Sequence, residues 1–191
     1  MNETIRCFFA IELPADLKDN LHRFISGLKT QASGVKWVKS TSLHITLKFL
    51  GHQAASRVDT LVTALSGQPI RVPSFDVQIG GFGAFPSRHR PRVFWLGVES
   101  LPHSPLYSLF EQLEERLEPL GFEKESRRFS PHLTLGRVKT GQSFESLWQW
   151  VEANPFENYR FAVNSFSLMQ SILKPSGAEY RNLQKYPLHA D

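Results

Sequence analysis

The sequence predicts an α+β fold of two lobes, in which two antiparallel sheets related by a pseudo-twofold axis carry helices on their outer faces and enclose a central groove. Two observations indicate this arrangement. The chain contains an internal repeat, and each half of the repeat reads as strand, helix, loop, strand, helix and strand. Short strands that alternate with only a few amphipathic helices are typical of sheets covered on one face, which is the α+β architecture.

The repeat is visible in two landmarks that share one offset. The pair Leu-Pro closes an apolar run at 13–14 and again at 101–102, and these positions lie 88 residues apart. The pattern His-x-Thr-Leu stands at 44–47 and at 132–135, with the same separation. Because two separate landmarks keep one offset, a repeated structural unit explains them better than chance does.

Each half begins with an apolar strand followed by an amphipathic helix. We expect the strands at 6–13 and 93–101. The helices are indicated by apolar residues at helical spacing, namely Leu17, Leu21, Phe24, Ile25 and Leu28, and then Leu106, Leu109, Phe110, Leu113 and Leu117. Each helix is expected to end near a glycine, Gly34 or Gly121, because glycine readily adopts the left-handed conformation that closes a helix.

The rest of each half supplies a second helix and further strands. The second helices are expected at roughly 54–66 and 143–153. Aromatic and β-branched residues indicate strands at 72–79, 161–168 and 180–186. No segment rich in proline, serine and glycine separates the halves, so we expect residues 1–191 to form a single bilobal unit.

The composition is that of an ordinary globular protein. Of the 191 residues, 41% are apolar and 21% are charged, and no apolar run reaches the roughly 18 residues that a transmembrane helix needs. No secretory signal is recognisable, and the single cysteine, Cys7, fits a reducing compartment. We therefore expect a cytoplasmic monomer without membrane contact. The net charge of +4 favours anionic partners such as nucleic acid without establishing one.

The two His-x-Thr segments are expected to place their polar side chains on one face of a strand. Alternation along LHITLKFL puts His44, Thr46 and Lys48 on one face and the intervening apolar residues on the other. In the second half, His132 and Thr134 share a face in the same way. If the lobes meet about the pseudo-twofold, the two polar faces line one groove and the histidines confront each other.

Two imidazoles and two hydroxyls in one groove match the needs of phosphodiester cleavage. The reaction requires a base that takes a proton from the nucleophile and an acid that protonates the leaving oxygen, and histidine can do either near neutral pH. The hydroxyls of Thr46 and Thr134 can donate hydrogen bonds to the non-bridging oxygens. A lone H-x-T is more often structural, but two copies at matching positions of a repeat indicate catalysis by His44 and His132.

Positive charge next to the histidines is a further expectation. Lys48 and Arg137 could both contribute it. By strict alternation, however, Arg137 lies on the face opposite His132, and only a bulge or turn at Gly136 would bring it into the groove.

Phe8, Arg88 and Arg90 are candidates for contact with a nucleic acid. Phe8 shares a face with Arg6 in the first strand and could stack on a base, although filling the core between the lobes is the simpler interpretation. Arg88 and Arg90 belong to the densest basic run of the chain. That run is either a solvated loop or a contact to an RNA backbone at the rim of the groove.

Other chemistries have little support in the sequence. There is no H-E-x-x-H or C-x-x-C pattern and no paired carboxylates near either histidine motif, so we expect no metal and no other cofactor. The glycine-rich segment 80–83 lacks the G-K-[ST] ending of a phosphate loop and is expected to be a turn. Ser130 lacks the G-x-S-x-G setting of a nucleophilic serine.

The segments LHITLKFLG and SPHLTLGR resemble the two signature motifs of the 2H phosphoesterase superfamily. More specifically, RCFFAIELP, KWVKSTSLHITLKFLG, GGFGAFPSRHRPRVFWLGV and SPHLTLGRV are similar, in this order and over most of the chain, to the RNA 2′,3′-cyclic phosphodiesterases, also called 2′-5′ RNA ligases. The resemblance implies a bilobal fold and cofactor-free hydrolysis of RNA or nucleoside 2′,3′-cyclic phosphates to 2′-phosphates. It also implies reversible 2′-5′ joining of RNA ends.

The resemblance also implies roles for individual residues. On the family's pattern, His44 is the proton donor and His132 the proton acceptor, whereas Thr46, Thr134 and Arg137 bind the phosphate.

Two alternatives stay open. One is another phosphodiesterase of the same superfamily, acting on 2′-5′ oligonucleotides, ADP-ribose cyclic phosphate or an RNA 3′ tail. The other is an RNA-binding module without turnover. The paired imidazoles argue against the second, because binding alone needs cationic donors rather than two titrating groups.

Overall fold

The computed structural model describes residues 4–101, 104–140, 143–175 and 177–188. In chain order its elements are β1 (Thr4–Glu12), α1 (Ala15–Gln31), β2 (Val35–Trp37), the 3₁₀ turn η1 (Ser40–Ser42), β3 (His44–Ala54), α2 (Ala55–Gly67), β4 (Phe75–Phe85), β5 (Val93–Leu101), α3 (Ser104–Leu117), the 3₁₀ turn η2 (Glu118–Leu120), β6 (His132–Val138), α4 (Glu145–Ala153), β7 (Tyr159–Val163), β8 (Ser165–Lys174) and β9 (Gly177–Pro187).

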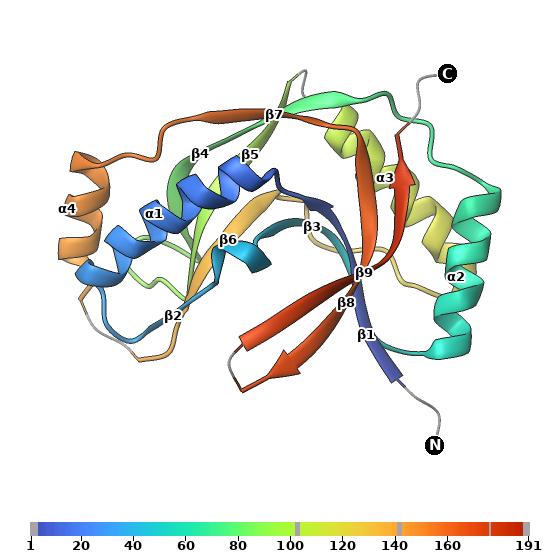
Figure 1. Ribbon diagram of the computed structural model, residues 1–191, viewed down its shortest axis with the longest axis horizontal. Coiled ribbons are helices and arrows are strands. Elements are labelled where there is room, and N and C mark those ends of the chain that lie inside the picture. Colours follow the sequence, from blue (N-terminus) through green and yellow to red (C-terminus); the bar gives the residue numbers. More distant parts are fainter. Residues whose placement is uncertain (1–3, 102–103, 141–142, 176, 189–191) are drawn as a thin grey trace.

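The strands form two antiparallel sheets, one in each lobe (Figure 1). The first has the order β3-β1-β8-β9, and the second has the order β2-β6-β5-β4-β7. The two H-x-T strands, β3 and β6, hold equivalent places, because each lies beside the opening strand of its half, β1 or β5. Apart from the extra edge strand β2, each sheet has four strands in the same arrangement, with the H-x-T strand at one end and the opening strand of its half next to it.

Two expectations about the strands are wrong in detail. The strand expected at 161–168 is two strands, β7 and β8, which belong to different sheets. The glycine-rich segment 80–83 is not a turn between strands but lies inside β4, where the pairing with β5 shifts between Gly80 and Phe82. Gly81 has a φ of +62°, a conformation that glycine adopts without steric cost, so the sequence signal marks a bulge.

The first helix of each half covers the sheet of the other half. Helix α1 covers the second sheet, which contains β6, and α3 covers the first sheet, which contains β3. In α1, the ring of Phe24 contacts Phe82 of β4 and Trp150 of α4, so α1 and α4 cover the second sheet. In α3, Glu114 forms an ion pair with Lys48 of β3, and α3 lies with α2 on the first sheet (Figure 1). The amphipathic stripes correctly predict that each helix is half-buried. Among the described helices, none combines the length and apolar character needed to cross a bilayer.

Each H-x-T strand contains a bulge at the same place in the repeat, at positions 88 residues apart, and β3 has a second bulge at Leu50. Between β1 and β3, Ala10 pairs with Thr46 and Phe9 pairs with Lys48, which leaves Leu47 without a partner residue. Between β5 and β6, the pairing skips Leu135 in the same way. An extra residue reverses the alternation of side chains, so every position after a bulge changes face.

Candidate active site

His44 and His132 are the first residues of β3 and β6, and the backbone holds their rings in the same way. Nδ1 of His44 lies 3.0 Å from the carbonyl oxygen of Ser42, and Nδ1 of His132 lies 2.7 Å from that of Ser130. A carbonyl oxygen can only accept a hydrogen bond, so each Nδ1 carries a proton. Nε2 of each ring therefore accepts a proton when the ring is neutral and donates one when it is charged.

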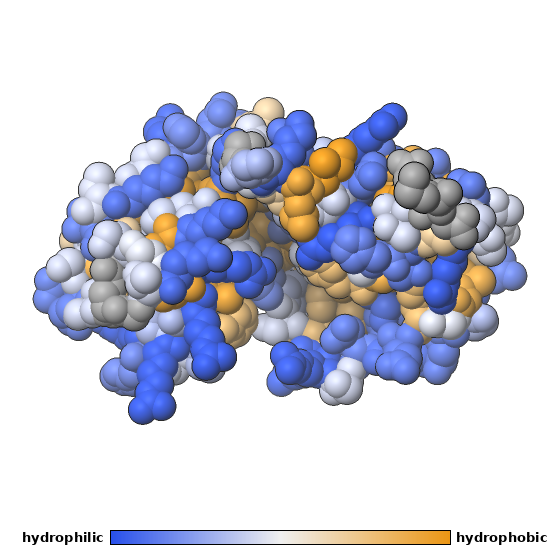
Figure 2. Space-filling view, turned by 90° about the horizontal axis from the view of Figure 1, so that it is seen from below, coloured by the Kyte–Doolittle hydropathy of each residue, from blue (hydrophilic) through white to orange (hydrophobic). Residues whose placement is uncertain are grey.

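The alternation expected before the bulges is confirmed. Ile45 and Leu133 are buried against the helices, whereas His44, Thr46, His132 and Thr134 are only partly buried on the opposite faces. Strands β3 and β6 approach each other to within 8 Å between Cα atoms. The backbone N–H of Val38, directly after β2, donates to the carbonyl of Leu135 in β6 at 2.8 Å and extends the pairing of β2 with β6 in the second sheet. Figure 2 shows a hollow between the lobes with hydrophilic side chains along its rim.

The expectation that Lys48 shares the face of His44 and Thr46 is wrong. Because of the bulge at Leu47, Lys48 turns toward the helices and is only 4% exposed. Its ammonium group donates to a carboxylate oxygen of Glu114 and to the carbonyl of Glu123, both at 2.6 Å. Lys48 therefore joins β3 to α3 and to the segment that leads to β6.

The corresponding bulge at Leu135 places Arg137 on the face of His132. Gly136 is buried and Arg137 is exposed, as the reversed alternation requires. A bulge was the condition under which Arg137 could reach the groove, and the structure meets it. Val93 and Lys36 pair with Arg137 on its two sides, so the residue lies within the sheet and not at its edge.

Phe49 occupies the position of β3 that is equivalent to Arg137, 88 residues earlier. It was expected on the helix-covered face, but the bulge turns it to the face of His44, where it is 49% exposed. Its ring stacks on Phe8 with centroids 5.3 Å apart, and the guanidinium of Arg6 lies 5.2 Å from its centroid. Sequence reasoning missed Phe49, although the repeat offset applied to Arg137 could have found it.

Phe8 is fully buried, so its expected role in stacking on a base is wrong. Its ring lies beneath the groove face, 4.7 Å from the ring of His44, and forms a small apolar cluster with Ala10 and Met169. Phe8 is thus a core residue, as the simpler interpretation held, but its described contacts lie within the first sheet and not between the lobes.

Tyr180 of β9 is a second residue that the sequence did not indicate. Its ring meets that of His44 edge-on, with centroids 4.9 Å apart and an interplanar angle of 85°. Burial raises the pKa of Tyr180, and the charges of Arg6 and Arg137 oppose that shift. Guanidinium groups from both sheets therefore act on one phenol, which makes this part of the groove cationic.

The environment of His44 disfavours its charged form. Burial lowers the pKa of the His44 imidazole, the carbonyl of Ser42 raises it, and the nearby charge of Lys18 in α1 lowers it further. The positive charge of Lys18 was not expected from any motif. Together with Arg6 and Arg137, it would attract an anion into the groove.

The basic loop between β4 and β5 begins beside His132, because the ring of Phe85 lies 5.1 Å from that imidazole. Arg88 is nevertheless directed toward α4. Its guanidinium group lies 2.7 Å from a carboxylate oxygen of Glu152 and 4.8 Å from the ring centroid of Trp148. Arg90 is exposed and remains a candidate for contact with an RNA backbone.

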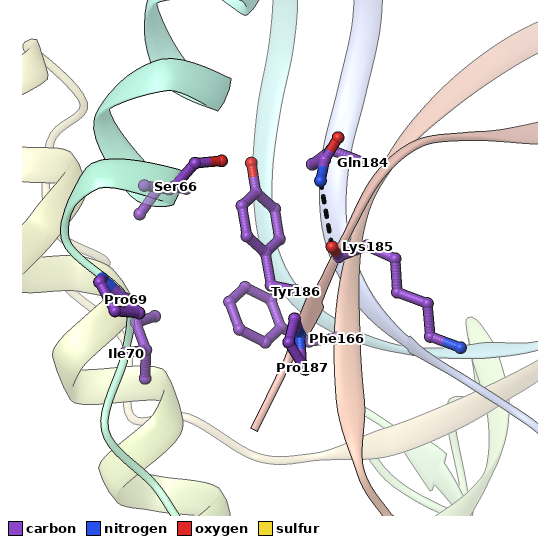
Figure 3. A pocket seen from close by; sticks show the side chains of 9 residues that line it. Ser66, Pro69, Ile70, Phe166, Gln184, Lys185, Tyr186 and Pro187 are labelled. Carbon is purple, nitrogen blue, oxygen red and sulfur yellow. Dashed lines mark hydrogen bonds between the residues drawn. The ribbon is translucent and has the colours of Figure 1, made fainter. Parts of the chain in front are cut away.

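The pocket drawn in Figure 3 is distinct from the histidine groove. It has a volume of about 280 Å³ and lies between the end of α2 and β9, on the helix-covered side of the first sheet. Tyr186 extends into it, and burial raises the pKa of this residue to about 12. Within the described part of the chain, no three side chains of the histidine, cysteine or carboxylate type gather as a metal site would require.

The comparison with known families supplies the decisive observation. Residues 17–174 match the family described as the 2′-5′ RNA ligase superfamily. The chain belongs to this superfamily. The match includes both H-x-T segments and most of the chain, so the resemblance predicted from the sequence is confirmed.

Two curated proteins illustrate what this chain is similar to. A protein of Thermotoga maritima is 34% identical over 180 residues, which are 94% of this chain and 93% of that protein. A protein of Escherichia coli K12 is 30% identical over 188 residues, which are 98% of this chain and 99% of that protein. Both are named RNA 2′,3′-cyclic phosphodiesterase.

Solved structures that are similar to this chain confirm the α+β fold. The Escherichia coli protein LigT in complex with 3′-AMP matches with a TM-score of 0.77 at 28% identity, covering 97% of this chain and 99% of LigT. A Thermus thermophilus protein matches with a TM-score of 0.80 at 25% identity, covering 98% of this chain and 100% of that chain.

Proposed function

We propose that this chain hydrolyses the 2′,3′-cyclic phosphate of RNA ends or nucleosides to the 2′-phosphate, as a monomer and without a cofactor. The observation that carries the proposal is the equivalent way in which His44 and His132 are held. Each Nδ1 is bound to the carbonyl two residues earlier, so each Nε2 is the atom that exchanges protons. The names of the curated relatives support the same reaction.

The proposed reaction is an in-line displacement at phosphorus. Nε2 of His132 takes a proton from water while the water oxygen forms a bond to phosphorus. The bond between phosphorus and the 3′ oxygen breaks, and Nε2 of His44 protonates that oxygen. One water is consumed, a 2′-phosphate and a free 3′-hydroxyl result, and proton exchange with solvent resets the two rings. A 5′-hydroxyl of a second RNA in place of water would give the 2′-5′ linkage.

The phosphate is proposed to bind between the two H-x-T strands. The hydroxyls of Thr46 and Thr134 project on the same faces as the histidines and would donate to the non-bridging oxygens. Arg137 would add a guanidinium group, which suits a planar pair of phosphate oxygens. Lys18 supplies a further positive charge near His44.

Phe49 is proposed as the surface on which the terminal base stacks. It is a half-exposed ring on the face of His44, and Phe8 supports it from behind. Every base presents a flat face, so stacking of this kind would bind substrates with different bases. Phe49 thus takes the role that the sequence had suggested for Phe8.

The central test is the incubation of 2′,3′-cyclic AMP with the protein in EDTA. We expect 2′-AMP as the product, and we expect His44→Ala and His132→Ala each to lower the rate on the order of 10²–10⁴-fold. His22→Ala, on the exposed side of α1, is the matched control for replacing a histidine. Formation of 3′-AMP, or near-normal turnover by either groove variant, would contradict the mechanism. Tight binding without turnover would favour the RNA-binding alternative.

The pH profile provides a second test. One neutral and one protonated imidazole are needed together, so kcat/KM should depend on pH as a bell whose limbs belong to the pair. An anionic substrate favours the imidazolium form of the acid, so the alkaline limb of kcat should lie above that of kcat/KM. A single rising limb, or loss of activity in EDTA with recovery on adding zinc or manganese, would indicate a metal-bound hydroxide instead.

The direction of proton transfer can be tested with an activated substrate. p-Nitrophenolate leaves without being protonated, so a variant that lacks only the acid should keep much of its activity on bis(p-nitrophenyl) phosphate. We expect this rescue for His44→Ala and not for His132→Ala. The reverse result would exchange the two roles.

A further inference from the structure

The two histidines are held alike by the backbone but not by neighbouring rings. His44 lies between two aromatic rings, Phe8 at 4.7 Å with an interplanar angle of 35° and Tyr180 at 4.9 Å with an angle of 85°. The ring contact described for His132 is with Phe85, at 5.1 Å and 79°. The pseudo-twofold that relates the histidines therefore does not extend to their surroundings.

Tyr180 is fixed in place by contacts on two sides. Its ring meets Phe8 edge-on at 5.1 Å, so Phe8, His44 and Tyr180 touch one another in a triangle. Two residues earlier, the carbonyl of Ala178 accepts a hydrogen bond of 3.2 Å from the hydroxyl of Ser42. Ser42 thus binds Nδ1 of His44 through its carbonyl and the strand of Tyr180 through its side chain.

We propose that Tyr180 is a positioning residue that makes the two histidines unequal, because its ring holds the imidazole of His44 in one orientation and shields it from water. The hydroxyl of Tyr180 is not required for this role. The consequence for turnover rests on the function proposed above, whereas the effect on His44 itself does not depend on any substrate.

The charged groups around His44 determine the sign of the expected effect. Lys18 of α1 acts on the imidazole directly, and Arg6 and Arg137 act on the neighbouring phenol. On β1, Glu12 pairs with His44 in register, but its carboxylate accepts hydrogen bonds from Ser167 and Asn182, both at 2.8 Å. Burial is the largest influence on His44, and it lowers the pKa of the imidazole. Removing the Tyr180 ring admits water and raises that pKa.

The test is an NMR titration of the ring protons of His44 in the free protein. We expect Tyr180→Phe to titrate as the unchanged protein does, because the ring is kept, and Tyr180→Leu to titrate at higher pH. Ser42→Ala keeps the carbonyl but loses the bond to Ala178, so it should shift the titration in the same direction by less. Phe85→Leu is the matched control from the other half and should leave the His44 titration in place.

The kinetic measurement should follow the titration. We expect kcat/KM on 2′,3′-cyclic AMP to fall roughly 10–100-fold in Tyr180→Leu, as misplacement of a reacting group does, and the limb due to His44 to move to higher pH. Tyr180→Phe should restore most of this loss.

The proposal would be overturned by an unshifted His44 titration in folded Tyr180→Leu, or by equal effects of leucine and phenylalanine. If Tyr180→Leu does not fold, an unshifted titration in Ser42→Ala overturns it. Absence of turnover in the unchanged protein would instead reject the proposed function, since the titration needs no substrate.

Discussion

The buried ion pair between Lys48 and Glu114 leads to a sharp prediction about stability. The ammonium and the carboxylate are 2.6 Å apart, and both residues are at most 5% exposed. In Glu114→Leu the ammonium stays in an apolar site between β3 and α3, with the carbonyl of Glu123 as its described partner. The backbone N–H of Glu125, 2.8 Å from the second carboxylate oxygen, loses its acceptor as well.

The expected loss is about 3–5 kcal/mol of unfolding free energy, which is the usual effect of removing one partner of a buried pair. For a chain of this length, each kcal/mol corresponds to about 2–4 °C, so the melting temperature should fall by roughly 6–20 °C. The double variant Lys48→Met with Glu114→Leu should recover most of the loss, because apolar residues of similar volume can replace such a pair.

Equilibrium unfolding in urea, followed by far-ultraviolet circular dichroism, gives all values of this double-mutant cycle. Glu118→Gln is the control, since it breaks an exposed pair with Lys124 at 2.9 Å, and water screens such a pair so that its loss should change the unfolding free energy little. A loss in Glu114→Leu no larger than that in the control would refute the reasoning. So would a double variant that is less stable than Glu114→Leu alone.

Three further predictions concern the groove and the pocket. Phe49→Ala should raise KM for 2′,3′-cyclic AMP by about 5- to 150-fold, since stacking on a base contributes about 1–3 kcal/mol. An unchanged KM would exclude Phe49 as the stacking surface. Arg137→Ala should lower kcat/KM by about 10- to 100-fold through loss of a charged hydrogen bond, with partial recovery in Arg137→Lys; equal activity of both variants would remove Arg137 from phosphate binding. Because burial raises the pKa of Tyr186 to about 12, the native phenol resists ionisation, and unfolding free energy should fall by about 2–3 kcal/mol as the pH rises from about 10 to 12. Tyr186→Phe should lose this part of the alkaline decline in urea midpoints, and an identical decline in both proteins would contradict it.

Much of the fold was predictable because secondary structure and the repeat depend on local pattern. The spacing of Leu17, Leu21 and Leu28 identifies a helix with one apolar face, and that face is buried in the structure. The same spacing does not say which sheet the helix covers. That choice depends on contacts such as the one between Phe24 and Trp150, which are far apart in the sequence.

The candidate site was predictable up to the bulges and no further. His44, Thr46, His132 and Thr134 precede the extra residues, so simple alternation places them correctly. Lys48 and Phe49 follow the bulge at Leu47, and alternation puts each on the wrong face. No residue type marks the bulge at Leu47, whereas Gly136 gave a hint of the one in β6.

Tyr180 was not predictable for a different reason. Its strand reaches the groove only because β8 pairs with β1, bringing Met169 beside Phe8, and β9 then pairs with β8. Pairing between segments so far apart in the sequence leaves no periodic signal along the chain. A tyrosine in the last strand therefore gives no sign in the sequence that it contacts His44.

The first sheet combines strands from both halves of the repeat, and this arrangement determines when the chain can fold. β1 lies between β3 and β8, so during synthesis one of its edges stays open until β8 has left the ribosome. Contacts that span such lengths form slowly, because they must offset the entropy lost in closing a large loop. Neither lobe can be completed from its own half of the repeat, and we expect both walls of the groove to form together only after β8 and β9 have been synthesised.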